Sequence, residues 1–267
     1  MIKVSFSGLR ERLQTLDRLE REQLPFAAAL ALTRTAQVVA GDLRTQMQVV
    51  FDRPTPATLD SLFIQPATKQ KMEARVWIKD GRSSGAGGQS VGRQGAWGKG
   101  RAAIKWLTPE VFGGPRDDKG IEGLLRRKGA LQQGQYIMPG ESMKGSLDKY
   151  GNISTGLMTK MLSGAGLYTE EGYNANATDS KRSKKKGNAQ RFFVMHNSKG
   201  KPIGIVERYA WGKGSRLSIR IAVAFVSKRP TYGKTLDFFA IAQRSAEDAL
   251  PIEFEKAMAQ ALATRRR

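Results

Sequence analysis

The only histidine is the first residue to test for catalytic chemistry. His196 follows the apolar run 192–195 and is followed by Asn197. General acid–base catalysis or metal binding by a histidine needs partner side chains that orient the ring. No second histidine and no nearby carboxylate in the sequence supplies them. We therefore interpret His196 as a turn or surface residue.

A small group of carboxylates offers a second kind of chemistry. Asp117 and Asp118 lie within the charged run 116–119, and Glu110 and Glu122 are close in sequence. A metal-dependent nuclease needs a further carboxylate held in line with such a pair. Nothing in the sequence aligns these residues. We expect a charged turn, and a metal-dependent nuclease stays open as an alternative.

Two loop motifs begin in this sequence but are not completed. The Gly-Lys pair at 98–99 is followed by Gly100, where a phosphate-binding loop needs Ser or Thr at the start of a helix. A calcium loop could begin at Asp148, but Tyr150 replaces a ligand and Ile153 stands where glycine is required. We expect a flexible loop and an ordinary turn. The sequence predicts no cofactor and no bound metal.

The best candidate for binding is a cluster of cations near residue 180. Its members are Lys181, Arg182, Lys184, Lys185 and Lys186. Such side chains can contact DNA phosphates without reading the base sequence. A solvated loop, or a contact to an acidic surface of a neighbouring subunit, explains the same residues. We leave these interpretations open, and we expect the basic tail 265–267 to be a frayed terminus.

The composition limits the classes of function. The chain has 267 residues, no cysteine and a formal net charge of +21. The absence of cysteine excludes disulfides, thiolate metal sites and a thiol nucleophile. A strongly basic chain favours polyanionic partners. Residues 80–199 hold 20 Lys and Arg against 10 Asp and Glu, the largest excess in the chain. We expect neither a membrane span nor a signal peptide, and synthesis in the cytoplasm.

Helices are expected at both ends of the chain. Spaced leucines predict an amphipathic helix over 7–22. A second helix should begin at Leu24-Pro25 and end near Val50, because proline is tolerated in a first turn. The C-terminal part predicts one helix over 236–250 and another that begins at Pro251. Shorter helices are expected at 121–128 and 156–163.

Strands and loops are expected between these helices. Residues 62–64 and 74–78 predict two strands. A hairpin is expected from 191–195 and 203–207, with Gly200 in its turn, followed by a third strand over 219–226. Long loops are expected at 80–105 and 173–188.

These elements predict an α+β fold. The N-terminal helices and a C-terminal helix should pack on an antiparallel β-sheet that takes strands from both halves of the chain. Residues 1–79 and 189–267 should together form one core domain. Residues 80–188 should form a loop-rich, basic insertion.

The order of elements resembles phage minor tail proteins of the lambda Z type and related prophage tail and neck (head–tail completion) proteins. In the N-terminal half the resemblance rests on Gly8-Leu9, the spaced leucines and the alanine-rich run 24–36. At the other end, the segment 249–262 resembles the closing helix of the family. The segments 51–55, 113–116, 136–140 and 148–154 resemble uncharacterised prophage proteins.

The resemblance implies a structural virion protein rather than an enzyme. Such a protein forms a ring of six or twelve copies around the DNA channel of a tailed bacteriophage. Its partners would be portal, adaptor or tail-tube proteins, with non-specific contact to genomic DNA, and its location would be the virion. Two alternatives stay open: a free DNA-binding protein that does not read sequence, and a metal-dependent nuclease.

Overall fold

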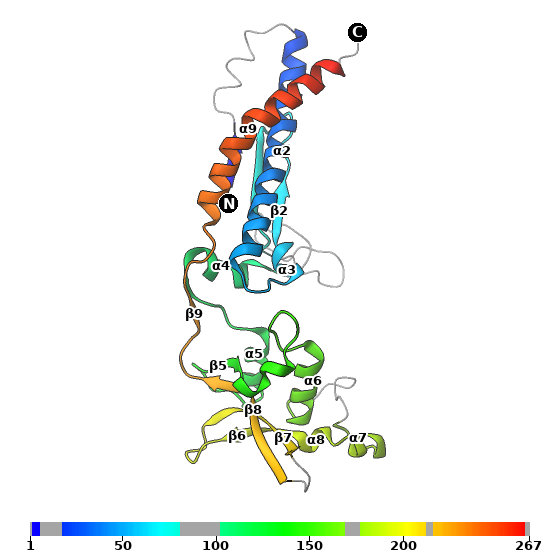
Figure 1. Cartoon of the computed structure of the whole chain (residues 1–267), viewed down its shortest axis with the longest axis vertical. Coiled ribbons are helices and arrows are strands. Elements are labelled where there is room, and N and C mark those ends of the chain that lie inside the picture. The colour runs from blue at the N-terminus through cyan, green and yellow to red at the C-terminus, as the bar shows by residue number, and fades with distance from the viewer. Residues whose placement is uncertain (1, 6–17, 81–101, 169–176, 212–215, 265–267) are drawn as a thin grey trace. The chain divides into compact units, whose positions relative to one another are not determined.

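The computed structural model describes residues 2–5, 18–80, 102–168, 177–211 and 216–264. The chain divides into two compact units (Figure 1). Unit 1 comprises Met1–Gly114 and Tyr232–Arg267, and unit 2 comprises Pro115–Thr231. The chain therefore leaves unit 1 once and returns to it once. A two-stranded sheet of β4 (Gly114–Pro115) and β9 (Thr231–Tyr232) lies where the chain crosses the boundary.

Unit 1 is built on two long helices. Helix α2 spans Arg18–Val50 and helix α9 spans Phe238–Ala263. They pack along each other although one is N-terminal and the other C-terminal (Figure 1). Two shorter helices complete the unit, α3 (Pro56–Leu59) and α4 (Ile104–Phe112).

A three-stranded antiparallel sheet lies against these helices. Strand β3 (Glu73–Ile78) is central, between β1 (Ile2–Ser5) and β2 (Leu62–Gln65). Ala74 and Val76 alternate with more exposed neighbours along β3 and are buried against α2. The predicted strands at 62–64 and 74–78 are confirmed. The enrichment in β-branched, aromatic and other apolar residues identified both segments, and β3 adds a partial alternation of buried and less buried residues.

The core of unit 1 is apolar. Its fully buried members on α2 are Leu32, Ala36, Val39, Leu43 and Met47. Residues 23–50 are also long and apolar enough, by length and composition, to cross a membrane. A buried core helix satisfies the same criterion. Packing within unit 1 therefore accounts for the apolar face of α2.

Two prolines lie inside the long helices rather than at their starts. Pro25 is within α2 and Pro251 is within α9, so the predicted breaks at these positions are wrong. Proline removes one backbone donor and crowds the preceding turn, which opposes a continuous helix. Near Pro25 and Pro251, fully buried alanines of the two helices pack together. These alanines are Ala27, Ala31, Ala257 and Ala261. Tertiary packing thus overrides the local preference. Of the predicted helix over 7–22, only residues 18–22 are described, and they belong to α2.

Unit 2 combines a four-stranded antiparallel sheet with short helices. Its strands are β5 (Tyr136–Pro139), β6 (Phe192–His196), β7 (Pro202–Trp211) and β8 (Arg216–Val226), in the order β5-β8-β7-β6. Its helices are α5 (Gly120–Arg127), α6 (Thr155–Gly164), α7 (Lys181–Lys186) and α8 (Asn188–Arg191), with a 3-10 turn at Glu141–Ser146. The predicted helices at 121–128 and 156–163 and the predicted hairpin are confirmed. Gly200 has φ +73° in the hairpin turn, as its position suggested.

Unit 2 has its own core and some very close backbone contacts. Buried apolar side chains of α5, α6 and the sheet meet around Leu125, Met161 and Phe192. A Cβ atom at Gly140 would lie 1.9 Å from the carbonyl oxygen of Ile221. The chain at Gly140, directly after β5, therefore lies so close to Ile221 of β8 that no side chain could be accommodated at this position.

The α+β class with antiparallel sheets is confirmed, but the strands do not form one sheet. The strands β6, β7 and β8 form one sheet with β5, which pairs with β8, and none of them pairs with β1, β2 or β3. They consequently belong to unit 2, whereas the expected core domain joined 189–267 to 1–79. The boundaries of the units lie at 114/115 and 231/232. The expected insertion 80–188 holds helices α4 to α7, and its glycine-rich part 81–101 lies outside the described residues.

Candidate polyanion-binding surface

The cation cluster forms a short helix rather than the expected loop. Ser180 is the N-cap of α7, and its Oγ accepts a hydrogen bond from the Ser183 amide at 3.2 Å. The Oγ of buried Ser183 accepts one from the Thr178 amide at 3.1 Å. At the other end Gly187 is left-handed, with φ +65°. Caps at both ends thus stabilise α7, which has few hydrogen bonds of its own because it is short.

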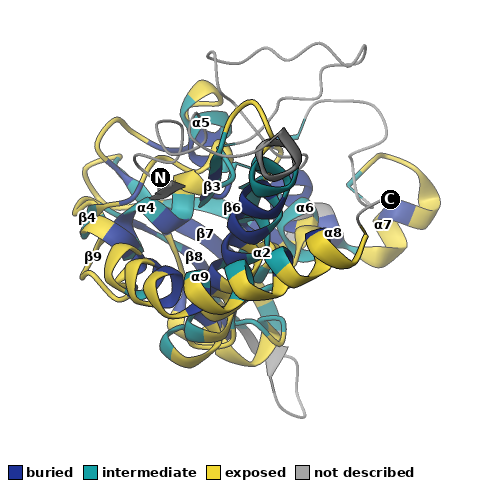
Figure 2. Ribbon diagram, turned by 90° about the horizontal axis from the view of Figure 1, so that it is seen from above, coloured by how far each residue is buried: buried dark blue, intermediate teal, exposed yellow. Residues whose placement is uncertain are grey.

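All five cationic side chains of α7 are exposed (Figure 2). Only the ammonium of Lys184 is ion-paired within the described chain, 3.5 Å from Asp179, and both partners are well exposed. An exposed pair of this kind contributes little. Like charges four residues apart, as in Lys181 and Lys185, cost about 0.2–0.5 kcal/mol each in a helix. The helix therefore concentrates positive charge, and among the described residues only the carboxylate of Asp179 pairs with it.

Two contacts fix α7 to the rest of unit 2 through α8. The side-chain amide of Asn188 donates to the carbonyl oxygen of Lys160 on α6, at 3.1 Å. Gly164 brings α6 against α8, since a Cβ there would lie 2.6 Å from the Asn188 carbonyl oxygen and 3.1 Å from atoms of Phe192. Helix α7 directly precedes α8 in the chain. The packing of α8 against α6 therefore also fixes the position of α7.

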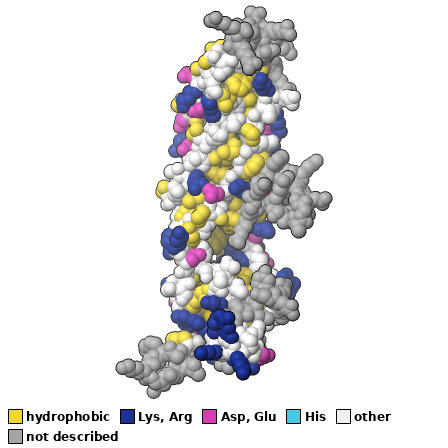
Figure 3. All heavy atoms as spheres, turned by 90° about the vertical axis from the view of Figure 1, so that its right-hand side faces the viewer, with side chains coloured by type: hydrophobic (Ala, Val, Ile, Leu, Met, Phe, Trp, Pro, Cys, Tyr) yellow, Lys and Arg dark blue, Asp and Glu magenta, His cyan; other side chains and the backbone are white. Residues whose placement is uncertain are grey.

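The surface around α7 belongs to the more basic unit. Unit 2 carries 22 Lys and Arg against nine Asp and Glu, an excess of 13 in 117 residues. Unit 1 carries 23 against 15, an excess of eight in 150 residues. On the face drawn in Figure 3, Lys and Arg side chains gather over unit 2. Helix α7 is thus the densest part of a broader positive field.

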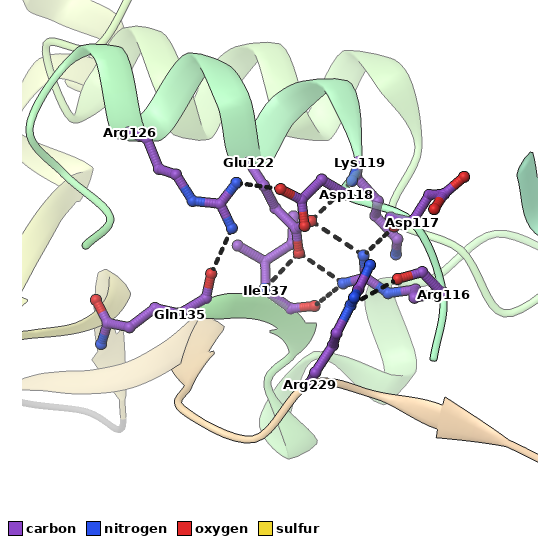
Figure 4. Close-up of polar contacts among 9 residues, drawn as sticks. All are labelled: Arg116, Asp117, Asp118, Lys119, Glu122, Arg126, Gln135, Ile137 and Arg229. Atoms are coloured by element: carbon purple, nitrogen blue, oxygen red, sulfur yellow. Dashed lines mark hydrogen bonds and ion pairs between the residues drawn. The ribbon is translucent and has the colours of Figure 1, made fainter. Parts of the chain in front are cut away.

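Two of the carboxylates that suggested a nuclease, Glu122 and Asp118, are bonded within unit 2. Arg116 and Glu122 form a buried ion pair, with N–O distances of 2.6 and 3.0 Å (Figure 4). Glu122 also accepts hydrogen bonds from the backbone amides of Lys119 and Ile137. Asp118 is bound by Arg126 at 2.5 Å. Among the described residues no group of three or more His, Asp or Glu side chains could hold a metal ion.

The environment of Glu122 keeps its carboxylate charged. Burial alone raises the pKa, but the Arg116 guanidinium and the two backbone amides outweigh burial and hold the pKa below its usual range. The positive charge of Arg116 is compensated in the same contact. In Figure 4 the guanidinium of Arg116 lies between Glu122 and the carbonyl oxygen of Ile137, to which it donates a hydrogen bond. The Nε of Arg229 donates to the backbone carbonyl oxygen of Arg116 at 3.0 Å.

A second buried carboxylate ties the sheet to α8. Glu207 on β7 is 1% exposed and accepts hydrogen bonds from Arg191 at 2.5 Å and Arg220 at 2.8 Å. Sequence reasoning named neither Glu207 nor the Arg116–Glu122 pair as important. The only available signal was a single acid inside an apolar strand pattern, since such an acid needs partners when it is buried.

The other candidate residues of the sequence do not meet in one site. His196 is exposed at the end of β6, next to an irregularity in the strand register. Asp148 makes a local turn, in which its Oδ1 accepts from the amides of Tyr150 and Asn152. Asp117 is exposed, and Glu110 bonds Thr235 in unit 1. The basic tail 265–267 lies outside the described residues.

Comparisons with known proteins return no relative of this chain. No family model, no curated protein and no solved structure matches it.

Proposed function

We propose that this chain is a non-enzymatic structural protein of a tailed-phage particle, a minor tail or neck component that forms a ring around the DNA channel. The sequence resemblance of the helical ends to lambda Z-type minor tail proteins supports the proposal. The resemblance also suggests the copy number of six or twelve, and the portal, adaptor or tail-tube neighbours.

The observation that carries the proposal is that the two units offer different surfaces for partners. Unit 1 exposes large apolar side chains, among them Val49 at 74%, Phe112 at 66% and Leu262 at 57%. Unit 2 also exposes apolar side chains, such as Ile219 at 55%, but it differs from unit 1 in carrying the dense group of exposed cations on α7. A closed ring needs head-to-tail contacts, in which each copy presents two unlike surfaces.

The test is the composition and assembly of phage particles. Particles purified from a lysate should contain this chain in several copies, as measured by quantitative mass spectrometry against the capsid protein. A lysate in which the gene carries a stop codon should yield incomplete particles, and the purified chain should restore infectivity in vitro. If the chain is missing from wild-type particles, the proposal fails.

One alternative has support from a specific observation. The exposed cations of α7 also fit a free protein that binds DNA without reading its sequence. In that case the chain would bind DNA in the cell and would be absent from particles. The same mass spectrometry separates the two functions.

A further inference from the structure

Helix α7 is unusual in what it exposes. Of its six residues five are cationic and exposed, and the sixth, Ser183, is the buried anchor. Lys181, Lys184 and Lys185 share one face by their helical spacing, and Arg182 and Lys186 share the neighbouring face. The exposed surface is thus entirely basic and contains no apolar side chain.

This composition distinguishes between the two kinds of partner. The buried centre of a protein–protein interface is depleted of lysine and enriched in aromatic side chains, methionine and arginine. Helix α7 has four lysines and one arginine, and it has no apolar or aromatic side chain. Phosphate groups, in contrast, are bound well by lysine, which acts as a mobile point charge. The chemistry of α7 therefore matches a phosphate backbone better than an acidic protein surface.

We propose that α7 contacts the phosphate backbone of double-stranded DNA without reading its sequence. A duplex carries roughly one negative charge per 1.7 Å of its axis, and a six-residue helix is about 9 Å long. Several cations can therefore meet phosphates at once. Base recognition in the major groove relies on bidentate side chains, chiefly Arg, Asn and Gln. Arg182 is the only such side chain within α7, and the inference accordingly assigns no sequence preference.

The inference rests on the proposed function in one respect, because genomic DNA is the polyanion that would pass through the assembled ring. Its test is independent of particles. Binding of the full-length purified chain to a duplex of arbitrary sequence is measured by fluorescence anisotropy, over a series of salt concentrations. The test variant is Lys181→Gln/Lys185→Gln/Lys186→Gln, because glutamine keeps the helix propensity and removes the charge.

The matched control removes the same charge elsewhere in unit 2. It is Lys144→Gln/Lys199→Gln/Lys228→Gln, three exposed lysines outside α7. Both variants have the same net charge, so a general field effect would weaken both equally. The thermal unfolding midpoint of each variant is measured alongside, and it should match that of the wild type.

The expected result is a loss in the α7 variant alone. Each phosphate contact contributes about 0.9 to the slope of log affinity against log salt. The α7 variant should show a slope shallower by about 2 to 3, and an affinity about tenfold or more lower near 0.1 M salt. A duplex of different sequence should give the same values.

Three results would overturn the inference. The first is that the wild-type chain fails to bind duplex DNA at 50 mM salt. The second is that the α7 variant and the control variant lose the same affinity. The third is that polyglutamate binds through α7 while DNA does not, which would identify an acidic protein as the partner. A failure of the virion proposal is distinguished by mass spectrometry of particles, because the chain would then be absent from them whatever its DNA affinity.

Discussion

The two units of this chain are stabilised in different ways. Every charged residue that is buried in the described chain lies in unit 2: Arg116, Glu122 and Glu207. The buried polar residues of unit 1 are uncharged, and its long helices meet through leucine, valine, methionine and alanine. Unit 1 should therefore respond mainly to lost apolar volume. Unit 2 should also respond to the loss of one partner of an ion pair, and to acid.

The largest expected effect is in unit 2. Glu122→Ala leaves the guanidinium of Arg116 buried without its carboxylate, which should cost about 3–5 kcal/mol of unfolding free energy. Hydrogen exchange of the amides in β5 and α5 should rise while the amides of α2 keep their protection. The double variant Arg116→Met/Glu122→Leu removes both charges and should recover part of the loss, because the amides of Lys119 and Ile137 still lack their acceptor. A single variant as stable as the wild type would contradict the role of the pair.

A loss in unit 1 should come from volume instead. Leu43→Ala empties a fully buried site between α2 and the core, with an expected cost of about 2–5 kcal/mol. The matched control is Val49→Ala on the same helix, whose side chain is 74% exposed, and which should change stability by no more than about 0.5 kcal/mol. Denaturant unfolding measures both. Equal effects of the two substitutions would exclude an apolar core at this position.

Acid should destabilise unit 2 more than unit 1. The folded state holds the pKa of Glu122 below its usual value, so its pairing stabilises unit 2 above the ordinary carboxyl range. That contribution is lost as the pH falls through the lowered pKa. Hydrogen exchange between pH 7 and 3 should show unit 2 weakening, and Glu122→Gln should reduce this dependence. If the glutamine variant keeps the full acid response of unit 2, other carboxyl groups are responsible.

The smallest expected effect concerns the contact between the two long helices. The Oγ of Ser245 on α9 donates to the Oδ2 of Asp42 on α2 at 2.5 Å. Ser245→Ala should cost about 1 kcal/mol, measured as a shift of the denaturation midpoint. Gln243→Ala removes an exposed contact within α9 and should cost less than about 0.5 kcal/mol. A larger cost of Gln243→Ala than of Ser245→Ala would show that the hydrogen bond from Ser245 to Asp42 does not stabilise the helix pair.

Local patterns in the sequence identified many elements but not their partners. The enrichment in β-branched, aromatic and other apolar residues located β3, and the turn around Gly200 located the hairpin of β6 and β7. The strand β5 was not predicted, because its four residues, ending in Pro139, carry no alternating pattern. Its pairing with β8 joins residues about 85 positions apart, which no local signal can report.

The same limit applies to the candidate surface. The five cations could be named from the sequence, since they are consecutive apart from one serine. Their helix was not predicted, although Ser180 and Gly187 are local capping signals, and its place on unit 2 depends on the packing of α8 against α6. The role of Glu122 was equally hidden, because its partners Arg116 and Ile137 reach it only in the folded unit.

The sequence by itself determined the α+β class, the basic charge and the position of most secondary structure, since these follow from composition and short-range periodicity. Only the tertiary structure decided that α2 and α9 run through their prolines, that the strands form two separate sheets, and that the packing of α8 on α6 places the exposed cations of α7. Each of these depends on contacts between distant residues. Their energies exceed the local preferences that the sequence displays.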